Sequence, residues 1–241
     1  MTVRVSMWSG PRNISTAMMR SFENRPDTVV VDEPFYAAYL AHTGIDHPGR
    51  DDVLASQPTD AARVVAALQS DPPEGIDVVY AKQMSHHVDD SMDLSWTLGQ
   101  RNVLLIRDPD QVVASYVRSR QACEPADIGV LQQLWLLELW GSAGATPPVI
   151  DADDFLRRPE AHLRWLCDWL GIAFTDAMLS WPDGTRDSDG VWAPYWYTAV
   201  RRSTGFEPWR AREISLSQHD AAVAAACRPA YEELRARRLP L

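Results

Sequence analysis

The sequence predicts an α/β fold of three layers, in which a central parallel sheet is flanked by helices. Apolar segments of strand length alternate with segments whose apolar residues recur at helical spacing, a pattern typical of parallel sheets with right-handed crossovers. The segment 102–106 is a continuous apolar run, as expected of a parallel strand buried on both faces. With 241 residues the chain can bury a full core, and residues 1–241 are expected to form a single domain.

The first half of the chain supplies most of the expected sheet. Apolar and polar residues alternate over 3–7, and helical spacing follows over 14–22. The other expected elements of this half are strands at 28–31, 76–81 and 102–106, and helices at 35–40, at 60–68 and from Pro109 onward. The stretch 44–58 is rich in Asp, Gly and Pro and is expected to be a surface loop.

The second half contains more helix than strand. Residues 128–140 are apolar nearly all round, which predicts a buried helix. A last strand is expected at 148–150 and a helix at 160–170. Within residues 181–241, an irregular segment rich in aromatic residues precedes a C-terminal helix that opens at Ser217. Pro229 is expected to kink or split that helix.

Composition narrows the classes of function. A net charge of −10 argues against a general nucleic-acid binder, so any anion site must be a local basic pocket. No apolar run is long enough to span a membrane, and the first strand begins almost at residue 1, so a cytoplasmic protein is expected. Cys123, Cys167 and Cys227 are widely spaced and are expected to be free, mostly buried thiols rather than metal ligands.

Basic residues are strongly biased toward arginine. The chain has 22 arginines and one lysine, Lys82. Lysine differs from arginine in being a compact point charge with a tunable pKa. Two explanations for the single lysine stay open: Lys82 is present by chance, or it has a role that arginine cannot fill.

Polar residues follow four of the expected strands. These segments are the loop after the first strand, Asp32–Glu33, 82–87 and 107–115. Because the carboxyl ends of parallel strands meet at one edge of a sheet, these segments should converge on one site. The first loop leads from strand to helix, which aims backbone N–H groups and a helix dipole at an anion. This edge is therefore the candidate binding site.

The first loop does not match the nucleoside-triphosphate motif. That motif needs a second glycine and a lysine where Ser15 and Thr16 stand. Asp32, at the end of an apolar strand, does resemble the acidic residue that holds magnesium in such enzymes. A P-loop kinase or NTPase-like phosphotransferase therefore stays as an alternative.

Two motifs resemble those of the sulfotransferases that use phosphoadenosine phosphosulfate (PAPS). Their first loop usually reads Pro-Lys/Arg-Ser-Gly-Thr-Thr, and residues 11–16 here read Pro-Arg-Asn-Ile-Ser-Thr. Their second motif is Arg-Asp/Asn-Pro after a strand, with a serine eight residues after the arginine, which corresponds to Arg107 and Ser115. The resemblance covers roughly residues 3–120 and implies a P-loop-like sulfotransferase architecture.

The resemblance also implies an activity. The family transfers a sulfuryl group from PAPS to a hydroxyl, or to an amine, of a small-molecule acceptor and releases phosphoadenosine phosphate (PAP). Two positions depart from the pattern, since Ile14 stands for a glycine and Met84 for a histidine. A non-catalytic nucleotide-binding member of the same fold is therefore a second alternative. Ile14 also limits the loop backbone there to ordinary, negative φ values.

The resemblance assigns the donor-binding residues by position. The first loop would hold the phosphosulfate through Gly10, Pro11, Arg12, Asn13, Ile14, Ser15 and Thr16. Arg12 would also neutralise charge on the bridging oxygen as the sulfuryl group leaves. Arg107 and Ser115 would bind the phosphate on the ribose. Arg201 and Arg202 resemble a late basic loop that closes on the same phosphate.

The resemblance assigns the chemistry to the other strand ends. Lys82 would contact the sulfuryl group, and Glu33 is favoured as the base because related members carry Glu-Pro after the second strand. His86 and His87 remain open as alternative bases. No metal is expected, nor a nucleic-acid or membrane partner, and a homodimer stays open.

Overall fold

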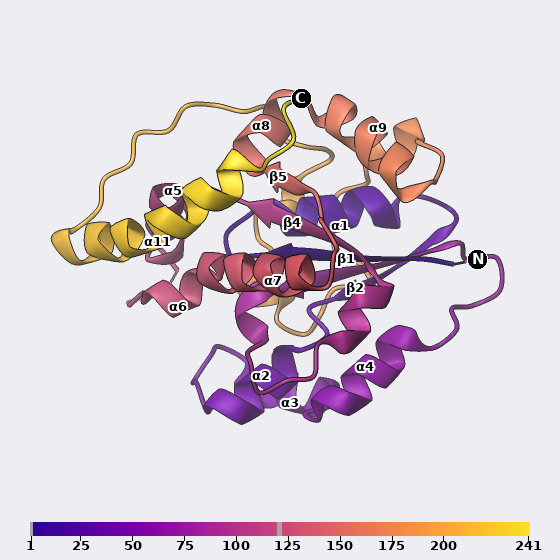
Figure 1. The fold of residues 1–241 in the computed structure, drawn as a ribbon, viewed down its shortest axis with the longest axis horizontal. Helices are drawn as coiled ribbons and strands as arrows, with labels where there is room; N and C mark the ends of the chain where they lie inside the picture. The colour runs from indigo at the N-terminus through magenta and orange to yellow at the C-terminus, as the bar shows by residue number, and fades with distance from the viewer. Residues whose placement is uncertain (1, 120–121) are drawn as a thin grey trace.

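Five parallel strands form one sheet in the order β2-β3-β1-β4-β5 (Figure 1). This computed structural model describes residues 2–119 and 122–241. The strands are β1 (Val3–Ser9), β2 (Thr28–Asp32), β3 (Val78–Met84), β4 (Arg101–Ile106) and β5 (Val149–Asp151). The central strand β1 pairs with β3 on one side and β4 on the other. The α/β fold with a central parallel sheet is thereby confirmed.

Helices cover both faces of this sheet. The longer ones are α1 (Ser15–Glu23), α2 (Tyr36–Thr43), α3 (Arg50–Ser56), α4 (Ala61–Gln69), α5 (Pro109–Tyr116), α7 (Val130–Ser142), α9 (Pro159–Leu170) and α11 (Gln218–Ala236). The shorter ones are α6 (Pro125–Ile128), α8 (Ala152–Arg157) and α10 (Ala193–Trp196), with the 3₁₀ turns η1 (Ser85–His87), η2 (Ser95–Gly99), η3 (Asp176–Leu179) and η4 (Val200–Arg202).

The alternation within β1 divides the core into two layers. Val5 and Met7 pack with Met18 of α1 and with α9 on one face of the sheet. Trp8 points to the opposite face, where Trp140 of α7 and residues of α4, α5 and α11 surround it. Side chains alternate across a strand, so one strand serves both layers. A third cluster joins α2, α3 and residues 192–197 beside the end of β2.

The structure corrects the sequence prediction for 44–58. This stretch contains helix α3, which follows the left-handed Gly49 (φ +74°). Its single buried residue, Val53, packs in the cluster with α2. One buried position is too weak a signal for a helical pattern among Asp and Gly residues.

Two more predicted boundaries shift. Strand β3 continues to Met84, so Lys82 lies within the strand, paired with Met7 of β1 and Asp32 of β2. Helix α11 runs unbroken through Pro229. Pro229 is exposed, as is Ala225, whose carbonyl loses its helical partner, so water can satisfy that carbonyl.

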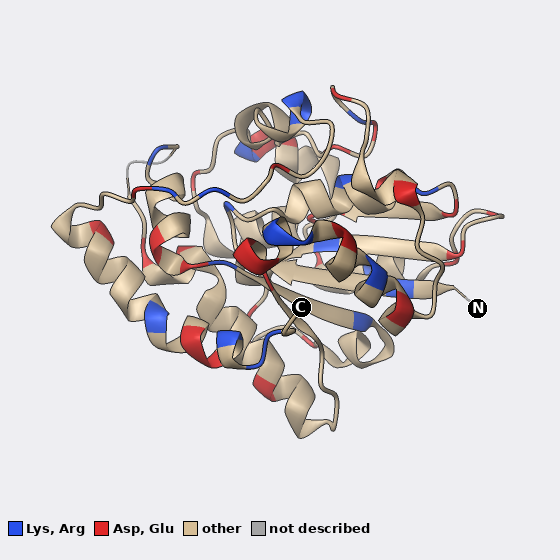
Figure 2. Ribbon diagram, turned by 90° about the horizontal axis from the view of Figure 1, so that it is seen from above, with Lys and Arg blue, Asp and Glu red and all other residues tan. Residues whose placement is uncertain are grey.

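The remaining expectations concern thiols and charge. The three cysteines are free and buried, as predicted. No helix among the described residues is long and apolar enough to cross a membrane. In the view of Figure 2, acidic and basic segments are interspersed along the helices, in keeping with a net charge of −10.

Candidate active site

A cavity of about 310 Å³ opens at the carboxyl ends of the strands. It is lined by most of the residues that the sequence singled out: Pro11, Arg12, Asn13, Ile14, Ser15, Thr16, Glu33, Lys82, His86, His87, Arg107 and Ser115. These residues come from four separate strand ends. The convergence expected from the parallel topology is therefore present in the structure.

Three predicted site residues do not line this cavity: Gly10, Arg201 and Arg202. A Cβ built on Gly10 would lie 2.1 Å from the carbonyl oxygen of Ile128, so this glycine allows the loop to pack on the backbone at Ile128. Arg202 is exposed on η4. In the C-terminal segment, the arginines that reach the cavity are Arg210 and Arg212.

The first loop turns at Arg12, whose φ is +56°. Left-handed backbone is unusual for a residue other than glycine. Ile14 has an ordinary φ of −86° and precedes α1, so the absence of a glycine there causes no conflict. Asn13 fixes the turn, because its side-chain amide donates to the Leu105 carbonyl at 2.9 Å and its oxygen accepts from the Ile14 N–H at 2.8 Å.

The first turn of α1 is suited to an anion. Helix α1 has no side-chain cap at Ile14 and no acidic residue in its first turn. The first N–H groups of a helix lack internal partners, and the helix dipole adds partial positive charge there. Ser15 and Thr16 begin this helix and line the cavity, so backbone and hydroxyl donors lie together.

Arg12 and Arg107 are linked across the strand ends. The Arg107 guanidinium donates to the Arg12 carbonyl at 2.6 Å, and Arg12 Nε donates to Ser115 Oγ at 3.1 Å. Gln111 accepts two further hydrogen bonds from Arg107, at 3.2 and 3.0 Å, and donates to Asp153 at 2.9 Å. The two motifs found in the sequence therefore form one connected cluster.

This cluster concentrates positive charge. Burial, followed by the charge of Arg118, lowers the pKa of Arg12. Burial and then the charge of Arg212 lower the pKa of Arg107, and Arg12 adds to that effect. Crowded guanidinium groups repel one another, so a bound anion would relieve the repulsion. The net charge of the chain is negative, yet this half of the cavity is cationic.

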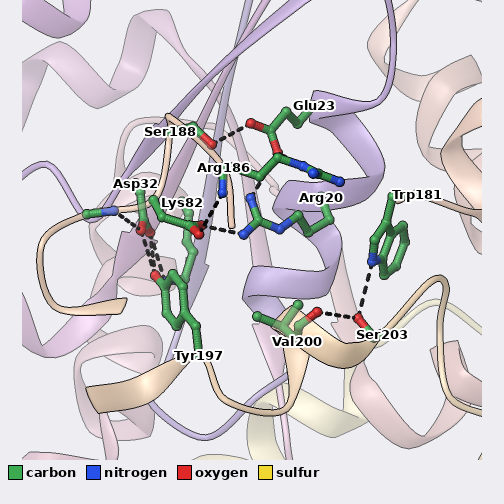
Figure 3. Close-up of polar contacts among 12 residues, drawn as sticks. Arg20, Glu23, Asp32, Lys82, Trp181, Arg186, Ser188, Tyr197, Val200 and Ser203 are labelled. Atoms are coloured by element: carbon green, nitrogen blue, oxygen red, sulfur yellow. Dashed lines mark hydrogen bonds and ion pairs between the residues drawn. The ribbon is translucent and has the colours of Figure 1, made fainter. Parts of the chain in front are cut away.

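The other half of the cavity centres on Lys82. Its ammonium donates to Asp32 Oδ1 at 3.0 Å and to the hydroxyl of Tyr197 at 2.6 Å (Figure 3). It also donates to Glu33 Oε1 at 2.5 Å. Only 2% of the Lys82 side chain is exposed, so this charge is held almost entirely by protein groups. Burial lowers the pKa of Lys82, but Asp32 and Glu33 outweigh it and the net shift is upward.

Glu33 has the second left-handed backbone among the described non-glycine residues, with φ +42°. Burial is the main cause that raises the pKa of Glu33, the charge of Asp32 raises it further, and Lys82 opposes both. A carboxylate with a raised pKa is a better proton acceptor near neutral pH than an ordinary one. Glu33 therefore has the properties of a base.

His87 is packed between two rings. It stacks on Tyr36 at 4.7 Å and on Tyr39 at 4.8 Å between ring centroids. Burial, and then the charges of His86, His47 and Lys82, lower its pKa well below the usual range. A neutral imidazole fixed by stacking makes His87 part of the cavity wall. His86 also lines the cavity and is less buried.

Several lining residues lie outside the set that the sequence motifs assigned to the site. They are Tyr36, His47, Trp196, Tyr197, Trp209, Arg210 and Arg212. Most come from the irregular segment whose aromatic content was visible in the sequence. Irregular backbone has no periodicity from which to infer the direction in which its side chains point. Only proximity in the fold shows which of these rings face the cavity.

Sheet order divides the cavity into two halves. Arg107, Ser115 and Asp153 follow β4 and β5, on one side of β1. Glu33 follows β2 and Lys82 lies in β3, on the other side of β1. The first loop, after β1, lies between them. A cationic half and a carboxylate–lysine half therefore meet at Arg12.

Comparison with known families and structures identifies the family of the chain and supports its fold. A family model described as a sulfotransferase domain matches residues 3–238. The sulfotransferase domain of the Synechococcus PCC 7002 olefin synthase is similar in structure, with a TM-score of 0.55 and 17% identity over 93% of this chain and 94% of that one. The sulfotransferase domain from the curacin biosynthetic pathway gives a TM-score of 0.54 and 14% identity over 94% and 97%.

Curated relatives occur in Arabidopsis thaliana. Branched-chain-amino-acid aminotransferase-like proteins 1 and 2 are 35% and 34% identical to this chain, over 90% and 96% of its length. The match covers 39% and 41% of those proteins. The chain thus spans about two fifths of the length of these curated relatives.

Proposed function

Because the chain belongs to the sulfotransferase domain family, we propose that it is a PAPS-dependent enzyme that transfers a sulfuryl group to a hydroxyl, or to an amine, of a small molecule. One observation carries the proposal: a cationic cluster and a buried carboxylate–lysine pair line the same cavity. The first suits a donor with several phosphates, and the second suits removal of a proton from an acceptor.

The cationic half fits the donor. PAPS supplies a sulfuryl group bonded to a phosphate oxygen, and a second phosphate on its ribose distinguishes it from ATP. Arg12 and the uncapped start of α1 would hold the phosphosulfate. Arg107 and Ser115 would bind the ribose phosphate, for which a guanidinium is suited because it can donate two parallel hydrogen bonds.

The other half would carry the chemistry. Glu33 would accept the proton of the acceptor hydroxyl as the acceptor oxygen bonds to sulfur. Arg12 would neutralise the negative charge that remains on the phosphate oxygen when its bond to sulfur breaks. The positive charge of Lys82 would act on the sulfuryl oxygens through space, because its three N–H groups are held by protein partners. Positioning and electrostatics then account for catalysis, by analogy with phosphoryl transfer.

The geometry disfavours a magnesium-dependent phosphotransferase. That alternative needs Asp32 to direct its carboxylate at a metal. Both Asp32 oxygens are already engaged, Oδ1 by Lys82 and both by the Tyr197 hydroxyl, and the Gly190 N–H donates to Oδ2 at 3.2 Å. Asp32 is therefore part of the protein's internal network.

Thermal-shift measurements with PAP, PAPS, magnesium-ATP and AMP test the donor. A ligand at one hundred times its Kd stabilises the folded state by about 2.7 kcal/mol, so PAP and PAPS should raise Tm clearly and magnesium-ATP should not. Stabilisation by magnesium-ATP and not by PAP would overturn the proposal.

Transfer is tested with PAPS labelled in its sulfuryl group and a panel of phenols, alcohols, sugars and amines. Labelled product that disappears in Glu33→Gln supports the proposal. Binding of PAPS with no product from any member of the panel would favour a non-catalytic nucleotide-binding protein.

A further inference from the structure

Every donor of Lys82 is already used. An ammonium group has three N–H donors. Those of Lys82 go to Asp32, Glu33 and Tyr197, each within 3.0 Å. The direction of the ammonium is therefore set by three partners, two of which, Asp32 and Tyr197, have no assigned role in the transfer.

The Tyr197 hydroxyl is equally committed. It donates to Asp32, at 2.7 and 2.6 Å from the two carboxylate oxygens, and accepts from Lys82 at 2.6 Å and from Trp192 Nε1 at 3.1 Å. One donor and two acceptor positions are all that a phenol offers. A buried polar network whose members are all satisfied holds a single geometry.

The segment that carries Tyr197 is anchored to α1. Arg20, 1% exposed, forms ion pairs with Glu23 and Asp189, and Ser188 donates to Glu23 (Figure 3). Gly190, which follows Asp189 in the chain, donates its N–H to Asp32 Oδ2 at 3.2 Å. The segment is thus held at residues 188–190 before the chain reaches Tyr197.

We propose that Asp32 and Tyr197 are positioning residues for the transfer, which hold the Lys82 ammonium so that its third N–H is directed at Glu33 Oε1. Among the described residues, the side chain that donates to the Glu33 carboxylate is that of Lys82, and this hydrogen bond falls on Oε1; the Tyr197 hydroxyl, whose proton goes to Asp32, lies 3.4 Å from the same oxygen. Oε2 is then the oxygen that takes the acceptor's proton. This inference rests on the proposed function, but its first test does not require turnover.

Several charged or titratable groups face this network. Asp32 ends β2 and Glu33 follows it, and Tyr197 follows α10. The three histidines His47, His86 and His87 line the same cavity, as does Arg12 of the first loop. Asp32 is the carboxylate in contact with Lys82 besides Glu33. Its charge raises the pKa of both Lys82 and Glu33, so its removal should lower both.

The first test reads Lys82 directly. Because Lys82 is the only lysine in the sequence, ¹³Cε-lysine labelling yields one side-chain NMR signal to follow with pH. In the wild type, Lys82 should stay protonated up to the highest pH at which the protein remains folded. In Asp32→Asn its titration midpoint should fall by about one unit or more, and in Tyr197→Phe by a smaller amount.

A matched control is available in the same segment. Tyr195→Phe removes a hydroxyl from an exposed tyrosine two residues away and should leave the Lys82 titration unchanged. Unchanged titration in both Asp32→Asn and Tyr197→Phe, in protein shown to be folded by its thermal transition, would overturn the inference. The result is independent of whether any acceptor is known.

The second test measures transfer to 4-nitrophenol from PAPS. Tyr197→Phe should lower kcat about tenfold, the effect of one buried hydrogen bond, with the KM for PAPS nearly unchanged. In Asp32→Asn both limbs of the pH–rate profile should move to lower pH. If Tyr197→Phe and Asp32→Asn lower Tm but keep the kcat and the pH–rate profile of Tyr195→Phe, the two residues are merely structural.

The two proposals fail in different ways. If wild-type protein binds no PAP, the proposed function fails, whereas the Lys82 titration still decides whether Asp32 and Tyr197 control this ammonium. If PAP binds and transfer occurs but neither variant alters Lys82 or kcat, the positioning roles fail and the proposed function stands.

Discussion

Arg12 and Glu33 are the two non-glycine residues with left-handed backbone in residues 2–119 and 122–241. Such conformations cost on the order of 1 kcal/mol or more each and persist where surrounding contacts impose them. Here Asn13 and Arg107 hold the first loop, and Lys82 holds Glu33. Both residues also have a role in the proposed transfer. Local strain and proposed chemistry therefore coincide at the scale of the residue.

The role of Arg12 can be tested by truncation. Arg12→Ala should lower kcat by about 10²–10³, the usual cost of losing one group that stabilises charge in the transition state. The fold should survive, because alanine tolerates the backbone about as well as arginine does. Turnover is measured with labelled PAPS, and Arg63→Ala, which changes an exposed residue of α4, is the control. Near-normal kcat in Arg12→Ala would contradict the role.

The raised pKa of Glu33 predicts the acid limb of the pH profile. Transfer needs ionised Glu33, so activity should fall as pH falls through its pKa. Because burial places that pKa above the usual range for glutamate, the fall should begin at higher pH than for an exposed glutamate. The measurement is log(kcat/KM) against pH. A profile flat down to pH 4.5, or a full profile in Glu33→Gln, would assign the base elsewhere, with His86 the next residue to test.

At the scale of elements, the first loop is supported from outside the site. Gly10 lies against the Ile128–Gly129 backbone that joins α6 to α7, and Gln133 of α7 donates to the carbonyls of Trp8 and Leu105 at 3.0 Å each. Helix α7 therefore fixes both the end of β1 and the end of β4. Since these ends carry Arg12 and Arg107, one buried amide sets the spacing between the two motifs.

This packing predicts the effect of a methyl group. Gly10→Ala would place a Cβ 2.1 Å from a backbone oxygen, so the loop must move, and the free energy of unfolding should fall by about 1–3 kcal/mol. Affinity for PAP should fall with it. Gly99→Ala is the matched control, because its Cβ would meet nothing within 4 Å. Denaturant unfolding and calorimetric titration with PAP measure both effects; equal behaviour of the two variants would exclude the proposed packing role.

At the scale of the whole molecule, the segment from Trp181 to Gly205 connects distant parts of the chain. It reaches α1 through Asp189, β2 through Gly190 and β3 through Tyr197. The two ends of the segment meet, because the Trp181 N–H donates to the Thr204 carbonyl at 3.1 Å. The Trp181 indole also donates to Ser203 at 3.2 Å (Figure 3). A segment without regular structure thereby becomes part of the candidate active site.

The anchor of this segment gives a prediction for the whole fold. Asp189→Asn should leave Glu23 as the one ion-pair partner of Arg20 among the described residues. The free energy of unfolding should fall by about 3 kcal/mol, the lower end of the range for breaking a buried ion pair. Amide exchange over 183–197 should become faster. Asp187→Asn, exposed in the same loop, is the control. Unchanged exchange in Asp189→Asn would show that the segment is held by other contacts.

The sequence alone determined the fold class and the edge of the sheet where the site lies. Alternating strands and helices specify a parallel sheet, and such a sheet brings the strand ends together. The motifs at Arg12 and Arg107 therefore pointed to a shared cavity without any tertiary information. These signals are local, because each depends on residues within one strand and the turn that follows it.

Only the tertiary structure decided which residues surround Lys82. Tyr197 lies 115 positions away in the sequence and reaches Lys82 through irregular backbone that has no period to read. The same is true of Arg210 and Arg212, which line the cavity while Arg201 and Arg202 do not. Local sequence sets the backbone of each strand and turn, but long-range packing sets which side chains from a loop face the site. The sequence motifs therefore predicted Arg12 and Arg107 of the cationic half, but they did not predict the hydrogen-bond network around Lys82.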